Sequence, residues 1–188
     1  GVPIYVNQPY EFAIRNPNPP GIPGDINHTG SYRRTFTIPE SWNGQQIYLH
    51  LDGIKSAGYV WINGKFAGYT EDSKLEAEFD VTSFVKTGVN QIAIQIIRWS
   101  DGSYLECQDF QRLAGIERDL YIYCRPKVHL NDLFVKAPLD DNYLNGLFSM
   151  QAEVFNFTGE NKEKTCVIAQ ITELSGTQVY CDTLRARE

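Results

Sequence analysis

The sequence predicts an all-β protein, a jelly-roll β-sandwich followed by a truncated immunoglobulin-like β-sandwich. Three observations favour an antiparallel β-sandwich of jelly-roll or immunoglobulin type. Apolar and polar residues alternate with a period of two through several short segments, as they do in half-buried strands. Turn-forming Gly, Asn and Asp residues separate these segments. No window of a dozen residues shows the 3.6-residue apolar repeat of an amphipathic helix.

The alternating segments lie at 32–38, 47–51, 92–96 and 148–154. The clearest local signal is a hairpin over 59–69, in which apolar strands flank Asn63-Gly64. Both residues of this pair tolerate the positive φ that a type I′ turn requires. Short helical turns are expected near Ser41-Trp42 and at 81–85, where Ser or Thr can cap.

A domain boundary is predicted near Arg125-Pro126, because a strand at 120–123 ends there and proline cannot donate to a strand ladder. Residues 1–125 then form one sandwich domain, which the resemblance described below implies is a jelly roll, and 126–188 form a second domain. The second domain shows about four strands, whereas a complete immunoglobulin-like sandwich has seven in about 100 residues. We expect a truncated domain with an exposed edge. Gly1, without a basic-then-apolar leader, suggests a processed chain or a fragment.

Composition excludes several classes of function. The chain of 188 residues carries a net charge of −6 and no Lys/Arg stripe, so we expect no nucleic-acid partner. No apolar run is long enough to cross a membrane, so no membrane partner is expected. The four cysteines, at 107, 124, 166 and 181, form no CxxC pair, and the three histidines are scattered. The sequence therefore shows no zinc site, and we expect free thiols that are buried or half-buried.

Two stretches resemble a known family. The first, 61–82, contains the hairpin Trp-Ile-Asn-Gly-Lys-Phe-Ala-Gly-Tyr, and the second, 98–110, begins Arg-Trp-Ser-Asp-Gly-Ser-Tyr and continues to Leu120. Both resemble the N-terminal, galactose-binding-like domain of glycoside hydrolase family 2, and the second resembles its large bacterial β-galactosidases in particular. The resemblance covers about residues 1–125, and 126–188 resemble the start of the immunoglobulin-like domain that follows. Cys107 replaces a usual acid, and Glu117 replaces a commonly apolar residue.

The resemblance implies the N-terminal fragment of a retaining exo-β-galactosidase that removes terminal β-galactose. The two catalytic glutamates would lie in a (β/α)₈ barrel C-terminal to residue 188, so no catalytic residue is assigned and the fragment is expected to be inactive. The implied partners are a galactoside and that barrel, in a parent that is a candidate homo-oligomer. The fragment needs no cofactor of its own, whereas the parent would use sodium, and magnesium in the barrel. Bacterial cytoplasm and periplasm both stay open.

Asp101 and Asn7 are the candidate site residues. Asp101 lies at a turn after an apolar strand, where its carboxylate can accept hydrogen bonds from sugar hydroxyls or ligate a cation. From spacing alone, an Asx-turn is the more typical role. Asn7 offers a donor and an acceptor, but by itself it is a polar loop residue before Pro9. The resemblance implies that both contact the galactoside and that Asp101 also helps to hold sodium.

Other residues keep a structural interpretation. Trp61, Trp99 and Tyr104 could stack on a sugar, although aromatic residues at strand ends usually belong to the core. Glu76 and Glu78 are expected to form a solvated acidic edge. Two alternative functions remain: a carbohydrate-binding module that works alone, and a purely structural domain of another family 2 glycosidase, such as a glucuronidase or mannosidase.

Overall fold

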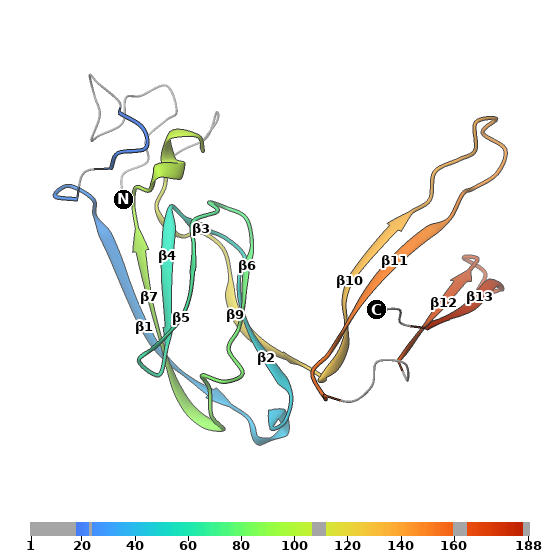
Figure 1. The fold of residues 1–188 in the computed structure, drawn as a ribbon, viewed down its shortest axis with the longest axis horizontal. Helices are drawn as coiled ribbons and strands as arrows, with labels where there is room; N and C mark the ends of the chain where they lie inside the picture. The colour runs from blue at the N-terminus through green and yellow to red at the C-terminus, as the bar shows by residue number, and fades with distance from the viewer. Residues whose placement is uncertain (1–17, 23, 107–111, 160–164, 186–188) are drawn as a thin grey trace. The chain divides into compact units, whose positions relative to one another are not determined.

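The structure, a computed structural model, describes residues 18–22, 24–106, 112–159 and 165–185 (Figure 1). It is all-β, as the alternation predicted, and the only helices in these ranges are two 3₁₀ turns, η1 (Glu40–Trp42) and η2 (Asp101–Tyr104). No helix in the described ranges could span a membrane. The chain divides into two units, Gly1–Cys124 and Arg125–Glu188, which we describe separately.

The larger sheet of the first unit has four antiparallel strands in the order β1-β7-β4-β5 (Figure 1). Their bounds are Thr29–Ile38 for β1, Gly88–Ile97 for β7, Ala57–Ile62 for β4 and Lys65–Thr70 for β5. The register pairs Ile94 of β7 with Tyr32 on one side and Val60 on the other. All these strands are rich in β-branched or aromatic residues, which fit a pleated surface.

A second sheet faces the first and closes the core. Its order is β6-β2-β9, with β6 at Ala77–Asp80, β2 at Gln46–Leu51 and β9 at Leu120–Arg125. A two-residue pair, β3 (Ile54–Lys55) with β8 (Gly115–Ile116), joins the end of the sandwich. Aliphatic side chains from both sheets fill the space between them, as the alternation requires: Ile38, Ile47, Leu49, Leu51, Ile54, Val60, Ile62, Val81, Ile92, Ile94 and Ile96.

The β4–β5 hairpin turns where the sequence predicted. Asn63 and Gly64 both have positive φ, 51° and 79°, so the type I′ turn is confirmed. The Asn63 side chain also connects the hairpin to other segments. Its amide donates to the Asn90 side chain at 2.8 Å and to the Phe84 carbonyl at 2.9 Å. The turn is thereby tied to the segment that precedes β7.

The two short helical turns expected from the sequence both form, to different extents. η1 covers the first, but 81–85 makes only an isolated turn, in which Phe84 and Val85 donate to the Val81 carbonyl. The turn does not propagate because the next amide, that of Lys86, donates to the Asn90 side chain at 2.9 Å instead of to a helical carbonyl.

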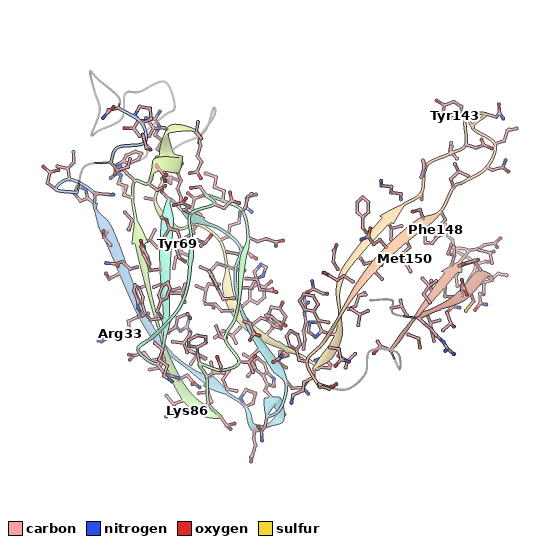
Figure 2. The ribbon with its side chains drawn as sticks, in the orientation of Figure 1. Arg33, Tyr69, Lys86, Tyr143, Phe148 and Met150 are labelled. Carbon is pink, nitrogen blue, oxygen red and sulfur yellow. The ribbon has the colours of Figure 1, made fainter. Side chains whose placement is uncertain are left out.

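The second unit consists of two antiparallel hairpins. One pairs β10 (Val128–Lys136) with β11 (Ser149–Asn156), and the other pairs β12 (Cys166–Thr172) with β13 (Gln178–Arg185). Figure 2 shows Tyr143 on the loop between β10 and β11, with Phe148 and Met150 farther along the hairpin. Large apolar side chains such as Phe134 and Ile168 are more than half exposed. Truncation of this domain stays a prediction.

The cysteines that the structure describes are free, as expected. Cys124 is half-buried, but Cys166 and Cys181 are exposed, so their predicted burial is wrong. They lie on the β12–β13 hairpin, whose residues are almost all exposed or half-buried. Cys107 lies outside the described residues.

Candidate functional site

Asp101 begins η2, immediately beyond the end of β7. Its side chain is exposed, and Oδ1 accepts a hydrogen bond from the Gly102 amide at 3.0 Å. In the described part of the chain no second group bonds to this carboxylate. An anionic oxygen is therefore available to a ligand at the end of the sandwich where η2 lies (Figure 1).

Buried serines support the turn that carries Asp101. Ser100 and Ser103 form a capping box around η2, in which the Ser100 amide donates to Ser103 Oγ at 3.0 Å. Ser56, between β3 and β4, is fully buried, and its Oγ hydrogen-bonds with the hydroxyls of Ser100 and Ser103, the latter at 3.2 Å. The turn is thus anchored to the sheet by side chains as well as by its own backbone.

The chain that leads into this turn is also fixed. The Asn27 side chain accepts from the Trp99 amide at 3.0 Å and donates to the Trp99 carbonyl at 2.7 Å. The Trp99 side chain is 2% exposed, so it belongs to the core. Tyr104 is half-buried, and its hydroxyl donates to the Gly21 carbonyl at 2.8 Å. The predicted core role is therefore confirmed for Trp99, whereas Tyr104 is only half-buried.

Aromatic rings cover part of the β4–β5 hairpin. Tyr59 lies 6.0 Å from Trp61, 6.3 Å from Phe66 and 4.7 Å from Tyr69, measured between ring centroids. We call these four residues the hairpin aromatic cluster. Phe66 and Tyr69 are 54% and 41% exposed, whereas Tyr59 and Trp61 are half-buried. Trp61 therefore packs within a partly exposed cluster, not in the core.

The charge of Asp101 reaches this cluster. Partial burial, followed by the hydrogen bond to Glu71 and the negative charges of Glu71 and Asp101, raises the pKa of the Tyr69 phenol. Figure 2 places Tyr69 toward the η2 end of the sheet. Asp101 makes the smallest of these contributions to the pKa of Tyr69.

Glu76 and Glu78 are both exposed, as the predicted solvated acidic edge requires, but Glu78 also contacts buried and half-buried neighbours. Glu78 Oε2 lies 3.3 Å from His50 Nδ1 and accepts a hydrogen bond from the Tyr123 hydroxyl. His50 Nε2 lies 2.8 Å from Asp52 Oδ1 and 3.5 Å from Glu76 Oε2. The side chain of Glu76 is 77% exposed and that of Glu78 is 35% exposed. The β2–β6 register places His50 opposite Glu78, and a strand-by-strand reading of the sequence does not show this pairing.

Asn7, the second candidate site residue, lies outside the described residues. The described residues contain no group of three or more His, Cys, Asp or Glu side chains that could hold a metal ion. Asp101 does fit one part of a sodium site, because its carboxylate is an exposed, hard oxygen donor. The remaining ligands would have to come from elsewhere.

The β-sandwich and its exposed carboxylate do not by themselves identify a family, whereas the comparison with known families does. The chain belongs to glycoside hydrolase family 2: the model described as "Glycosyl hydrolases family 2, sugar binding domain" matches residues 1–126.

Curated relatives make the likeness more specific. A β-galactosidase of Priestia megaterium is 46% identical over 156 residues, which are 82% of this chain and 15% of that protein. A β-galactosidase of Yersinia pestis is 42% identical over 153 residues, which are 81% of this chain and 14% of that protein. The chain therefore spans about one seventh of the length of these relatives.

Solved structures share the fold. A β-glucuronidase of Ruminococcus gnavus superimposes with a TM-score of 0.69 at 21% identity, covering 87% of this chain and 30% of that one. A β-glucuronidase of Bacteroides uniformis gives a TM-score of 0.68 at 26% identity, covering 85% and 20%.

Sequence reasoning missed the residues that support Asp101. Ser56 precedes β4 and lies 44 residues before Ser100, so no local pattern connects them. The only local signal was the Ser-x-x-Ser spacing of 100 and 103, which is a weak form of the capping-box pattern.

Proposed function

We propose that this chain is the non-catalytic N-terminal part of a retaining exo-β-galactosidase, in which Asp101 completes the galactoside pocket. The observation that carries the proposal is an exposed carboxylate held on a buried serine support. The 42–46% identity to proteins named β-galactosidase supports the choice of substrate class. Asn7 is proposed as a second pocket residue.

The chemistry is assigned to the rest of the parent protein. Retaining hydrolysis needs two carboxyl groups about 5 Å apart, one as nucleophile and one as acid and base. Among the described carboxylates, Glu78 is held by His50 and Tyr123, which suits structure better than acid–base work. We assign both catalytic glutamates to a C-terminal barrel, which would also hold magnesium. Assembly of the parent as a homo-oligomer is part of the same proposal.

Asp101 has two proposed tasks in the pocket. Its carboxylate accepts hydrogen bonds from galactose hydroxyls, which orients the sugar. It also supplies one anionic oxygen to a sodium ion, whose positive charge would help to bind sugar oxygens. Both tasks are binding tasks, so this side chain acts on substrate affinity more than on bond cleavage.

The test is Asp101→Asn in the complete protein that carries this segment. The amide keeps the size of the side chain but removes its charge. We expect KM for a nitrophenyl β-galactoside, and the sodium concentration that gives half-maximal activity, each to rise about tenfold, the equivalent of one strong hydrogen bond. Asp132→Asn, at an exposed position on β10, is the matched control and should leave both constants unchanged. Unchanged constants in Asp101→Asn would favour a purely structural domain.

The hairpin aromatic cluster gives a reason to test a second function, that of a binding module that works alone. Exposed aromatic rings beside a carboxylate can bind a sugar face. Calorimetric titration of residues 1–188 with galactose separates the two ideas. Micromolar affinity would favour the module, whereas we expect neither micromolar binding nor β-galactosidase activity from this segment.

A further inference from the structure

Ser56 is fully buried and contacts the turn that carries Asp101. Its hydroxyl hydrogen-bonds with both Ser100 and Ser103. Ser56 and Ser103 have no exposed surface, and Ser100 is 9% exposed. Three hydroxyl groups are thus gathered in a region of low dielectric, where hydrogen bonds are strong and a missing partner is costly.

This arrangement connects both sides of Asp101 to one residue that precedes β4. Ser100 precedes Asp101, and Ser103 follows it by two residues, so Ser56 holds both flanks of the residue. The Ser56 backbone is fixed in turn, because its amide donates to the Ile97 carbonyl of β7 at 3.1 Å. A shift of the Ser56 hydroxyl would therefore move the turn relative to β7.

The neighbouring residues leave the turn little room. A Cβ on Gly102 would lie 3.2 Å from Glu106 Oε1 and 3.5 Å from Ser100 Oγ. The same Glu106 oxygen accepts from the Ser73 amide at 3.1 Å. The turn is thus packed on the side of Glu106 as well as anchored by hydroxyl groups. Nothing about the local sequence of 98–106 requires a partner as distant as Ser56.

We propose that Ser56 is a positioning residue for the galactoside pocket, acting through Ser100 and Ser103 to set the direction of the Asp101 carboxylate. The inference rests on the proposed function of Asp101, but it concerns a residue that contacts neither sugar nor cation. A hydroxyl that served only the fold would stabilise the domain without changing sugar or sodium affinity.

The experiment compares Ser56→Ala with Ser100→Ala and Ser100→Thr in the complete protein. Both alanine variants lose the hydrogen bond between Ser56 and Ser100. Ser100 has extended backbone angles, φ −121° and ψ 173°, which suit a β-branched residue, so threonine can keep the hydroxyl. We expect the alanine variants to raise KM and the half-saturating sodium concentration about tenfold with kcat within twofold, and threonine to restore both.

A second readout does not depend on turnover. Calorimetric titration with a thiogalactoside, which the enzyme cannot cleave, should show about tenfold weaker binding by Ser56→Ala in sodium buffer. The control is Thr82→Val, which removes a part-buried hydroxyl that accepts from the Ile47 amide at 2.8 Å. Thr82 lies between β6 and β7 and contacts the first residues of β2, away from the hydroxyl groups of Ser56, Ser100 and Ser103. The Thr82→Val change should lower thermal stability without changing thiogalactoside affinity.

The outcomes separate the two proposals. If Asp101→Asn raises KM and Ser56→Ala folds with unchanged KM, sodium dependence and thiogalactoside affinity, the positioning role is wrong and the proposed function stands. If Asp101→Asn changes nothing, both fall. Should Ser56→Ala fail to fold, the Ser100 pair decides, because equal KM values for Ser100→Ala and Ser100→Thr would overturn the inference.

Discussion

Replacing Asn90 by Asp tests how far a single buried side chain holds the first unit together. Asn90 is 2% exposed, at the start of β7. Its amide nitrogen donates to the carbonyls of Lys86 at 2.6 Å and Gly88 at 2.8 Å. Its oxygen accepts from the Asn63 side chain at 2.8 Å and from the Lys86 amide at 2.9 Å. The side chain therefore satisfies all four of its hydrogen-bonding sites.

Aspartate has the shape of asparagine, but a carboxylate oxygen takes the place of the amide nitrogen that donates two hydrogen bonds. The two accepted bonds survive, while two carbonyl oxygens then face a carboxylate that cannot donate. Two lost hydrogen bonds at about 1 kcal/mol each, plus the desolvation of a buried charge, give a loss of about 3–5 kcal/mol at pH 7. That is a large fraction of the 5–15 kcal/mol that stabilises a typical domain.

The loss should depend on pH in a definite direction. Burial raises the pKa of the introduced carboxyl above its unfolded value of about 3.9. The protonated form is neutral and can donate one hydrogen bond, so the variant is least impaired below pH 4. As the pH rises through the folded-state pKa, stability relative to the wild type falls.

The assay is urea unfolding at pH 3.5, 5 and 7, followed by tryptophan fluorescence. The three tryptophans, Trp42, Trp61 and Trp99, all lie in the first unit, so the signal reports on that unit. Gln91→Glu introduces the same charge at the exposed neighbouring position and should change the free energy of unfolding by less than about 0.5 kcal/mol. A loss for Asn90→Asp that is below 1 kcal/mol at pH 7, or that is equal at pH 3.5 and 7, would refute the reasoning.

Two further predictions concern strand β5. In Gly68→Ala the new Cβ would lie 2.3 Å from two ring carbons of Phe79, so the ring must move. We expect about 1–3 kcal/mol of destabilisation in the urea assay. An unchanged unfolding midpoint would show that the ring moves without cost. The pKa of Tyr69 is raised in the folded state. Its contribution to the free energy of unfolding is therefore complete below about pH 10 and is lost as the pH rises further. Tyr69→Phe should therefore lose less stability than the wild type between pH 8 and 11, and parallel losses would contradict the assigned shift.

Local signals were sufficient for most of the secondary structure. Period-two alternation predicted the strands at 32–38, 47–51 and 92–96, and Asn63-Gly64 predicted the turn, because both depend on neighbours within a few residues. The short strands β3, β6 and β8 were not predicted. They have between two and four residues, too few for a period to be recognised. The segment 81–85 makes a single turn that does not extend, because the Lys86 amide donates to the Asn90 side chain, a partner that local patterns do not show.

The sequence by itself determined the fold class, the family resemblance and the choice of Asp101. Alternation, turn chemistry and a short motif all depend on residues that are close together in the sequence. The tertiary structure alone decided what surrounds that aspartate. Ser56 meets Ser100 across 44 residues, and Glu78 meets His50 across 28, because antiparallel pairing brings distant segments together. Hydrogen bonds of this kind depend on strand register and side-chain direction, and these are fixed only when both sheets close on a common core.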